Sequence, residues 1–445
     1  MHNTTNIKSN LRRLTGAVAL TLLAQFAHAD DLLDVYRLAL ENDSEYRGAG
    51  ASNRGAQEQI PLARAQLLPE ANVTGSIDAV NQDVRSISGG GGGTTRFSNR
   101  ALTLSITQPI FRKDLLIGLN QADSRVRQAN AEYAFALQDL ILRVAERYFG
   151  VLEAEDALES TRAARDANEQ QLKQSKQRFD VGLIAITDVE EAQAGFDLEN
   201  AAVIAAETDV DNSLEALREI TGSYLNSVDQ LRADTPLVTP VPNDIDDWTT
   251  TALEQNLQLM AVNLATDTAR DEIRRQEAGH VPTVDLVGQH GYSISGGRLG
   301  DSNIVTTSIG FQFNIPIYQG GEILSRTREA RHLHEASLED LQRQRRITQR
   351  QARDAFRGVI SGISRVQALA QAVVSTEAAL EAIEAGFQVG TRTSVDVLDA
   401  QRDLFRAKFD HAQARYAYIV DILRLKQAAG TLTSSDLTEV NSWLQ

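Results

Sequence analysis

The strongest constraint on this chain is that it repeats one short pattern. The segment QRFDVGLIAITDVEEAQ begins at Gln177 and the segment AGFQVGTRTSVDVLDAQ begins at Ala385. The two share Phe, Val-Gly, Asp-Val and Ala-Gln at an offset of 208 positions, and the same offset relates Gly222 to Gly430. Self-similarity at a fixed spacing is the signature of a duplicated structural unit. We therefore expect a fold that contains two copies of one unit.

The duplication extends upstream with a different spacing. Pro69 corresponds to Pro282 and Gly75 to Gly288, at an offset of 213 positions. A longer loop in the first copy explains the change, because residues 86–98 read SISGGGGGTTRFS. The predicted organisation is a signal peptide over residues 1–29, a first repeat over 30–235, an equatorial linker over 236–247, a second repeat over 248–430 and a C-terminal equatorial tail over 431–445.

The N-terminus has the layout of a secretory signal. Lys8, Arg12 and Arg13 precede an apolar run over residues 14–27 and the small-residue triplet Ala-His-Ala. This run is shorter than the ~20 residues that a membrane-spanning helix needs, so the pattern favours a cleaved signal over a membrane anchor. The mature chain is expected to begin at Asp30.

Composition excludes several classes of function. The formal net charge is −16, which argues against binding to nucleic acid or to anionic lipid. Cysteine is absent, which excludes disulfides, thiolate metal sites and a lipid anchor on an N-terminal cysteine. Only 5% of the residues are aromatic, a composition that favours long helices over the core of a globular enzyme.

Two long stretches of the chain are predicted to be helical. Proline is absent over residues 111–235 and from residue 317 to the end. Within these stretches apolar residues recur every three or four positions, as helices require. They are Tyr133, Leu137, Leu140, Val144, Tyr148 and Val151 in the first copy and Phe356, Val359, Ile363, Val366, Ala370 and Val373 in the second. A single helix over residues 113–179 would be about 100 Å long. A simple coiled-coil rod would explain this pattern equally well.

Between the helical stretches the apolar period changes to two. Pro69, Pro109, Pro282 and Pro316 mark the edges of these segments, where proline is tolerated. The alternation predicts hairpins over residues 71–108 and 283–315, with strands of about 10 to 13 residues and glycine-rich tips. Strands of ~9–11 residues with one apolar face suit a transmembrane barrel. A soluble hairpin packed on its own domain would alternate in the same way.

Four strands cannot close a barrel around a lumen, and open strand edges cannot face lipid. A membrane barrel would therefore need several chains, and three would supply twelve strands. The predicted fold class is mixed, all-α plus membrane β-barrel, with two internal structural repeats per chain.

The mature chain resembles the TolC family of outer-membrane channels. The resemblance rests on the stretches VGLIAITDVEEAQA, EAGFQVGTRTSVDVLDAQ, ARYAYIVDILRLKQAAGTL and TQPIF. It implies a homotrimer in which a twelve-stranded barrel in outer-membrane lipid continues into a twelve-helix periplasmic α-barrel. It also implies an equatorial belt, formed by the proline-rich linker and the C-terminal tail, and a periplasmic end that is closed at rest.

The resemblance implies a passive exit duct for tripartite efflux pumps or type I protein secretion, without a cofactor. The expected location is the outer membrane, with an extension into the periplasm. The implied partners are a periplasmic adaptor (membrane fusion) protein and an inner-membrane pump or ABC transporter. Contact with these partners would open the periplasmic end.

In this resemblance, the repeated turn is where a helix descending to the tunnel entrance reverses. The residues that match the family's closed-state links are Gln171, Thr187, Asp188, Glu384, Phe387 and Arg392. Phe387 departs from the pattern that the resemblance implies, because a family channel similar to this chain has tyrosine there. Since Phe387 has no hydroxyl, we expect the closed state to depend more on a bond from Arg392 to Asp188 and Thr187.

Asp396 and Asp399 match the acidic pair that lines the entrance constriction in the family. Their spacing of three places them on one helix face. Helix capping is an alternative explanation, because Ser394 could cap the helix and carboxylates are favoured in a first turn.

Two other classes of function remain to be weighed. An enzyme has little support, since the pair His332 and His334 would point apart on a helix and suit a metal poorly. A periplasmic coiled-coil adaptor or scaffold would share the heptads but would lack amphipathic hairpins of membrane length.

Overall fold

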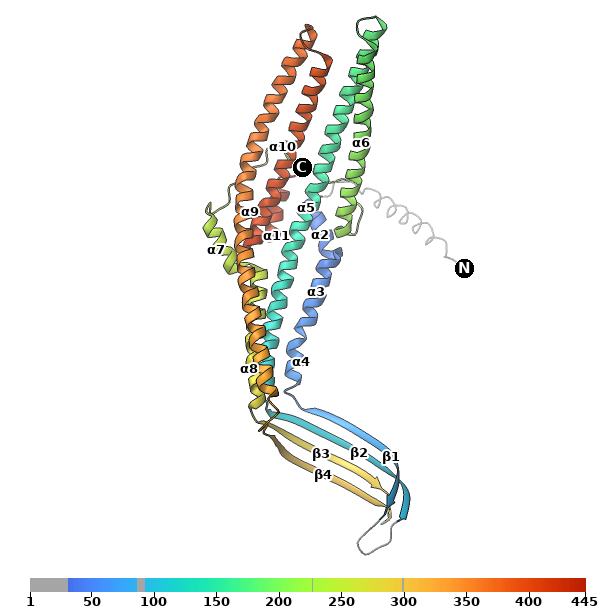
Figure 1. Cartoon of the computed structure of the whole chain (residues 1–445), viewed down its shortest axis with the longest axis vertical. Helices are drawn as coiled ribbons and strands as arrows, with labels where there is room; N and C mark the ends of the chain where they lie inside the picture. Colours follow the sequence, from blue (N-terminus) through green and yellow to red (C-terminus); the bar gives the residue numbers. More distant parts are fainter. Residues whose placement is uncertain (1–30, 86–92, 226, 298–299) are drawn as a thin grey trace, which may run out of the picture.

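The computed structural model describes residues 31–85, 93–225, 227–297 and 300–445. A four-stranded sheet lies at one end, and helices extend from it along the long axis of the molecule (Figure 1). The predicted signal peptide and most of the first glycine-rich loop lie outside the described residues.

The sheet is antiparallel with the strand order β1-β2-β3-β4. The first hairpin consists of β1 (Glu70–Val84) and β2 (Gly93–Phe111), and the second of β3 (Thr283–Ser295) and β4 (Ser302–Asn314). With 15 and 19 residues, β1 and β2 are longer than predicted. Strand β2 runs beyond Gln108 because its register with β3 shifts between Pro109 and Phe111, and a bulge accommodates a residue without an amide hydrogen.

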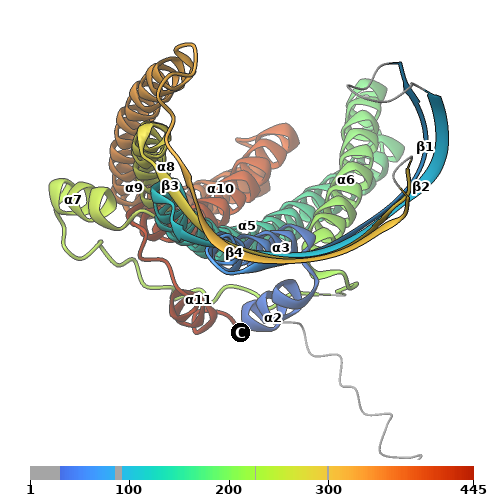
Figure 2. The same cartoon turned by 90° about the horizontal axis from the view of Figure 1, so that it is seen from below.

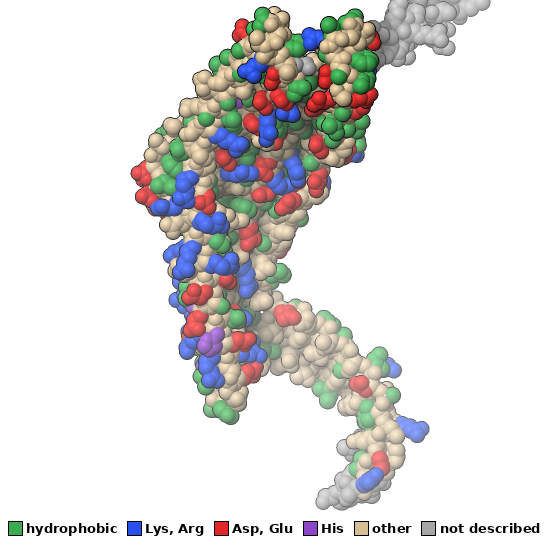
Figure 3. Space-filling model, turned by 45° about the horizontal axis from the view of Figure 1, so that its top comes forward, with side chains coloured by type: hydrophobic (Ala, Val, Ile, Leu, Met, Phe, Trp, Pro, Cys, Tyr) green, Lys and Arg blue, Asp and Glu red, His purple; other side chains and the backbone are tan. Residues whose placement is uncertain are grey.

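One face of the sheet is apolar and exposed. Directly paired residues share a face, and the pairs Val73 with Leu104 and Leu286 with Phe311 lie on this one. The opposite face carries polar residues such as Thr103 and Gln312. Charged side chains are dense over the helices and sparse over the sheet (Figure 3). The sheet thus exposes a contiguous apolar surface of the kind that soluble monomeric proteins bury.

Two very long helices run away from the sheet. Helix α5 (Lys113–Asp180) has 68 residues and confirms the helix predicted over 113–179, and α9 (Glu322–Gln388) has 67. After a tight turn, each is followed by a helix that runs back, α6 (Ile186–Thr221) and α10 (Ser394–Ala429). None of the described helices combines the length and the apolar character that a helix needs to cross a membrane.

Shorter helices complete the arrangement. They are α2 (Leu32–Asn42), α3 (Ser44–Gln57), α4 (Gln59–Ala65), α7 (Ile245–Gln255), α8 (Leu257–Glu277), the 3₁₀ turn η1 (Ala278–His280) and α11 (Ser434–Asn441).

An ion pair connects the sheet to the start of α5. The guanidinium of Arg112, just before α5, donates two hydrogen bonds to the buried carboxylate of Asp285 in β3, with nitrogen–oxygen distances of 3.0 and 2.7 Å.

The helices form a single curved layer. Near the sheet, α5 packs between α3–α4 and α8, and α8 packs on α9; away from it, the order is α6, α5, α10, α9. Viewed along the long axis, this layer and the sheet follow one arc, with α2, α7 and α11 on the convex side (Figure 2). Helix α9 therefore occupies one edge of the arc, and α3, α4 and α6 the other.

The main hydrophobic core lies at the middle of the helices, where α2 and α11 pack against the long ones. Seven of the twelve residues of the predicted apolar stripes are buried here, and Val144, Tyr148 and Val359 have no exposed surface. An antiparallel bridge joins Leu231, close to the linker, to Leu444 in the tail. The linker and the tail thus belong to the same middle region, called the belt below.

Candidate functional site

The two repeated turns have the same backbone geometry. In the first turn, the amide of Gly182 donates to the carbonyl of Phe179 (2.8 Å) and that of Leu183 to the carbonyl of Arg178 (2.9 Å). In the second, the amides of Gly390 and Thr391 donate to the carbonyls of Phe387 (3.1 Å) and Gly386 (2.9 Å), the residues 208 positions later. Gly182 and Gly390 have φ angles of 76° and 80°, a conformation that only glycine adopts without strain.

A cleft of about 970 Å³ separates the two turns. Five of the sequence-predicted residues line it, namely Gln171, Asp188, Phe387, Arg392 and Asp399. Thr187 is exposed beside the cleft on the first turn of α6. The structure thus brings residues from both repeats together at the end of the molecule remote from the sheet.

Arg392 lies close to its own turn. A Cβ atom on Gly386 would come within 2.8 Å of the Arg392 Cγ, so the aliphatic part of this side chain packs on the glycine backbone. Among the described residues, no hydrogen bond or ion pair joins Arg392 to Thr187 or Asp188 within one chain. Arg392 and Asp188 thus line the same cleft without the predicted bond between them.

A different arginine connects the two repeats. The guanidinium carbon of Arg178, in the last turn of α5, lies 4.8 Å from the centroid of the Phe387 ring. A cation over an aromatic face at this distance is attracted by the ring quadrupole. Sequence reasoning missed Arg178. The equivalent position in the second copy is Gly386, so the alignment of the repeats gave no signal for a cation at this place.

Asp396 has a capping role. Its carboxylate accepts from the amide (2.8 Å) and the hydroxyl (2.9 Å) of Thr393, and the Thr393 hydroxyl accepts from the amide of Asp396 (3.2 Å). The N-cap is therefore Thr393, whereas the alternative drawn from the sequence had named Ser394 as the residue that could cap this helix. The bonds from Thr393 hold the pKa of Asp396 below its usual value. The first repeat has Ala185 at this position and no side-chain cap.

The remaining predicted residues make contacts within their own repeat. Asp399 pairs with Arg402 on α10 at 2.8 Å, and both side chains are more than half exposed. The side-chain amide of Gln171 donates to the hydroxyl of Ser175 (3.4 Å), and the side-chain amide of Gln401 donates to the carboxylate of Glu384 (3.5 Å). Within the described residues, no group of three or more His, Asp or Glu side chains is placed to hold a metal ion.

A sheet with an exposed apolar face, joined to helices about 100 Å long that end in a polar cleft, defines the subunit of a membrane channel with a long helical extension. The relationship to known proteins agrees with this class. The chain belongs to the outer membrane efflux protein family, whose model matches residues 35–223 and 248–431.

Several relatives have been described. The chain is 37% identical to the outer membrane protein TolC of Vibrio cholerae over 96% of this chain and 97% of that protein. It is 30% identical to the alkaline protease secretion protein AprF of Pseudomonas aeruginosa over 94% of this chain and 88% of that protein. Among solved structures, the Campylobacter jejuni CmeC outer membrane channel has a TM-score of 0.78 at 17% identity, covering 93% of this chain and 90% of that one.

The predicted family resemblance is therefore confirmed. The protein is an outer-membrane efflux and type I secretion channel that extends into the periplasm, and it is a transport conduit and not an enzyme. Proteins of this family work with a periplasmic adaptor and an inner-membrane pump. The relatives do not favour the alternative of a coiled-coil adaptor.

Proposed function

We propose that three copies of this chain form a closed channel-tunnel that serves as the passive exit duct of an efflux pump or a type I secretion system. The arc of the single chain carries this proposal. Strands β1 and β4 each have one unpaired edge, and α9 lies along the edge of the helical layer opposite α3, α4 and α6. Three arcs would pair every strand edge and produce a twelve-stranded barrel above a tunnel of twelve helices.

In this assembly the apolar face of each sheet contacts outer-membrane lipid, and the polar face lines the lumen. Exposed side chains such as Ile77, Ile309 and Phe313, each more than half accessible in the single chain, are suited to hydrocarbon and not to water. Each protomer contains the two repeats of residues 30–235 and 248–430. The linker over 236–247 and the tail over 431–445 form a belt around the tunnel.

The cleft between the turns becomes the periplasmic entrance. Six turns meet there in the trimer, held closed by links among the predicted residues, by the contact from Arg178 to Phe387 and by a bond from Arg392 to Asp188 of a neighbouring copy. An adaptor and a pump engage this end and open it. Drug efflux and protein export are both consistent with the relatives, one of which is named for the secretion of alkaline protease.

Single cysteines test the topology directly. Cysteines at Leu104 and Phe311, on the apolar face, are expected to react only with membrane-confined thiol probes. A cysteine at Gly300, beside the tip of the second hairpin, is expected to react with an impermeant reagent added to intact cells. The native chain has no cysteine, so every label reports the introduced site. Labelling of Leu104→Cys by the impermeant reagent would contradict the proposed topology.

Ion selectivity tests the proposed entrance ring of Asp396 and Asp399. Six carboxylates around one pore favour cations, so the reconstituted trimer is expected to prefer cations and to be blocked by trivalent cations from the periplasmic side. The double variant Asp396→Asn/Asp399→Asn is expected to weaken this block by on the order of tenfold or more. Glu169→Gln, which removes a partly exposed carboxylate of α5 that pairs with Lys173, is the matched control. An unchanged block in the double variant would leave Asp396 with capping as its role.

A further inference from the structure

A second cavity lies in the belt, far from the entrance. It has a volume of about 270 Å³ and lies between the linker, α7, α10 and α11. Its walls are largely apolar and include Pro240, Val440 and both tryptophans of the chain, Trp248 and Trp443. Helices α7 and α11 lie on the convex side of the arc (Figure 2), so the cavity is on the opposite side from the proposed lumen.

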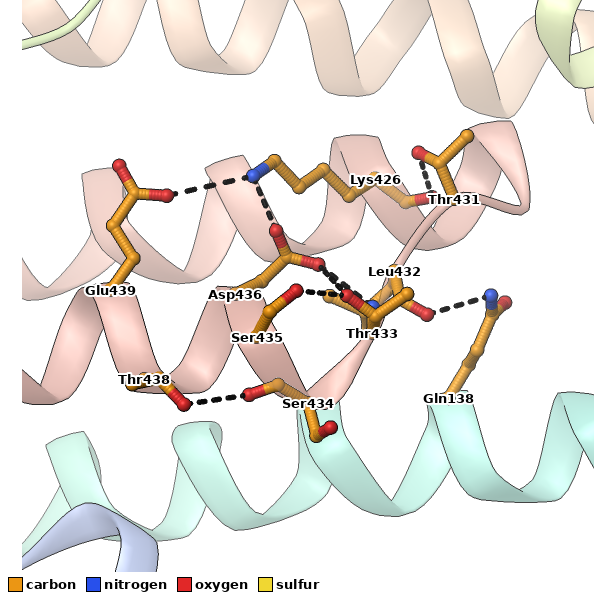
Figure 4. Close-up of polar contacts among 10 residues, drawn as sticks. All are labelled: Gln138, Lys426, Thr431, Leu432, Thr433, Ser434, Ser435, Asp436, Thr438 and Glu439. Carbon is orange, nitrogen blue, oxygen red and sulfur yellow. Dashed lines mark hydrogen bonds and ion pairs between the residues drawn. The ribbon is translucent and has the colours of Figure 1, made fainter.

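The walls of this belt pocket are fixed by hydrogen bonds. Lys426 on α10 pairs with Asp436 on α11 at 2.6 Å, and Gln138 on α5 donates to the carbonyl of Leu432 at 3.0 Å (Figure 4). The hydroxyl of Tyr418 donates to the carbonyl of Val238 (2.9 Å), and the Trp248 indole donates to that of Pro242 (2.7 Å). These bonds fix the positions of the linker and of α11 relative to α10, so the pocket is preformed.

One carboxylate in the pocket has no strong partner. Asp436 is satisfied, because its second oxygen accepts from the amide (2.7 Å) and hydroxyl (3.0 Å) of Thr433. Glu439 lies 3.9 Å from Lys426, its side chain is 57% exposed, and it accepts no side-chain hydrogen bond from the described residues. The charged residues that line the pocket are Lys426, Asp436 and Glu439. Since Asp436 has strong partners, the polar group available to a ligand is the negatively charged carboxylate of Glu439.

We propose that the belt pocket binds a lysine or arginine side chain, flanked by an apolar residue, that is presented by a periplasmic protein partner. The apolar stem of such a side chain fits between the tryptophans, and its charged end reaches Glu439. The volume of about 270 Å³ lies near the lower end of the roughly 300–1,000 Å³ that small-molecule pockets usually span, and it suits a single long side chain. The belt pocket is distinct from the entrance. This proposal depends on the proposed trimer in one respect, because the trimer places the convex side of each chain on the outside of the tunnel.

Tryptophan fluorescence gives a direct test, because both indoles of the chain line this pocket. The probe is the peptide acetyl-Leu-Arg-Leu-amide, titrated into the purified full-length protein in detergent. We expect a saturable change in tryptophan emission, with affinity about fivefold higher than for acetyl-Leu-Gln-Leu-amide, the neutral control. Glu439→Gln is expected to remove this preference, and Val238→Phe, which fills the pocket from the exposed linker, to abolish the response to both peptides.

Several results would overturn the proposal. These are equal affinity for the two peptides, an unchanged preference in Glu439→Gln, or no saturable emission change in the native protein. Butylammonium that binds as tightly as the arginine peptide would assign the pocket to a free amine and not to a protein. Glu439→Gln must retain the native thermal midpoint, as its exposed position predicts. Peptide binding requires no conduction, so failure here is distinguishable from failure of the channel topology in the cysteine experiment.

Discussion

Replacing Arg178 with glutamine is expected to raise the resting conductance of the reconstituted channel. Glutamine keeps much of the side-chain length but removes the charge that lies over the Phe387 ring. Each such contact at a partly exposed site contributes about 0.5–1 kcal/mol. Three copies acting together would shift the ratio of closed to open channels roughly ten- to a hundredfold, since each 1.4 kcal/mol is a factor of ten. Single-channel recording in a planar bilayer measures this shift.

A double-mutant cycle separates this contact from other effects at the entrance. Phe387→Leu removes the ring but keeps an apolar side chain, and it is expected to raise the conductance as Arg178→Gln does. The double variant should then add little to either single change. Lys173→Gln is the matched control, because Lys173 lies on the same helix and, within the described part of the chain, forms its one ion pair with Glu169 of that helix. Fully additive effects would show that Arg178 and Phe387 act independently.

Phe387→Tyr is informative in the same assay. Tyrosine at this position adds a hydroxyl donor inside the cleft that Asp188 also lines. We expect a lower resting conductance in this variant and a higher one in Arg392→Ser, which removes a second cation from the cleft. If Arg392→Ser leaves the resting conductance unchanged, helix packing and the contact from Arg178 to Phe387 are the interactions that close the entrance.

The largest effect on stability is expected from Asp43→Ala in the belt. Arg143 on α5 holds the buried Asp43 through two bonds of 3.0 Å, and the same carboxylate accepts from the amide of Tyr46 at 2.7 Å as the N-cap of α3. Removing one partner of a buried pair costs about 3–5 kcal/mol. We expect a loss near the lower end of this range, because Arg143 retains Asp139 as a partner at 2.8 Å. Guanidinium unfolding in detergent, followed by circular dichroism, measures the change.

The pH dependence of this pair follows from its pKa. Burial alone would raise the pKa of Asp43, but bonds from Arg143 and the Tyr46 amide hold it below its usual value. A carboxyl whose pKa is lowered by folding contributes stability above its unfolded pKa of about 3.9, and this contribution is lost as the pH falls through the folded value. The difference between native protein and Asp43→Asn should therefore be full at neutral pH and shrink below about pH 4.

An exposed acid provides the comparison for this measurement. Asp340→Asn removes a carboxylate whose pair with Arg343 is mostly exposed, so it is expected to change stability by less than about 1 kcal/mol at any pH. A similar loss in Asp340→Asn and Asp43→Ala would show that the belt pair has no special role.

The features that the sequence alone determined are those encoded by local patterns. The apolar spacing predicted α5 to within a residue of its end, and the alternation predicted both hairpins, because helix and strand periods depend on neighbouring residues. The repeated Val-Gly pair places a glycine in each turn, and the structure gives Gly182 and Gly390 the positive φ angles that favour glycine. The matching motifs predicted the family. Errors occurred at boundaries, where the bulge after Pro109 and the cap at Thr393 extended or moved an element by one to three residues.

Only the tertiary structure decided which distant side chains meet. The rotation of each long helix about its axis sets the direction of every side chain, and packing against several other helices fixes that rotation. For this reason Arg178, and not Arg392, makes the cation–ring contact that joins the two repeats at the entrance within one chain, although Arg392 was the cation that the sequence singled out. The same packing gathers Asp43 and Arg143, and the two tryptophans of the belt pocket, from segments at least 100 residues apart in the chain, a separation at which local patterns carry no information about contact.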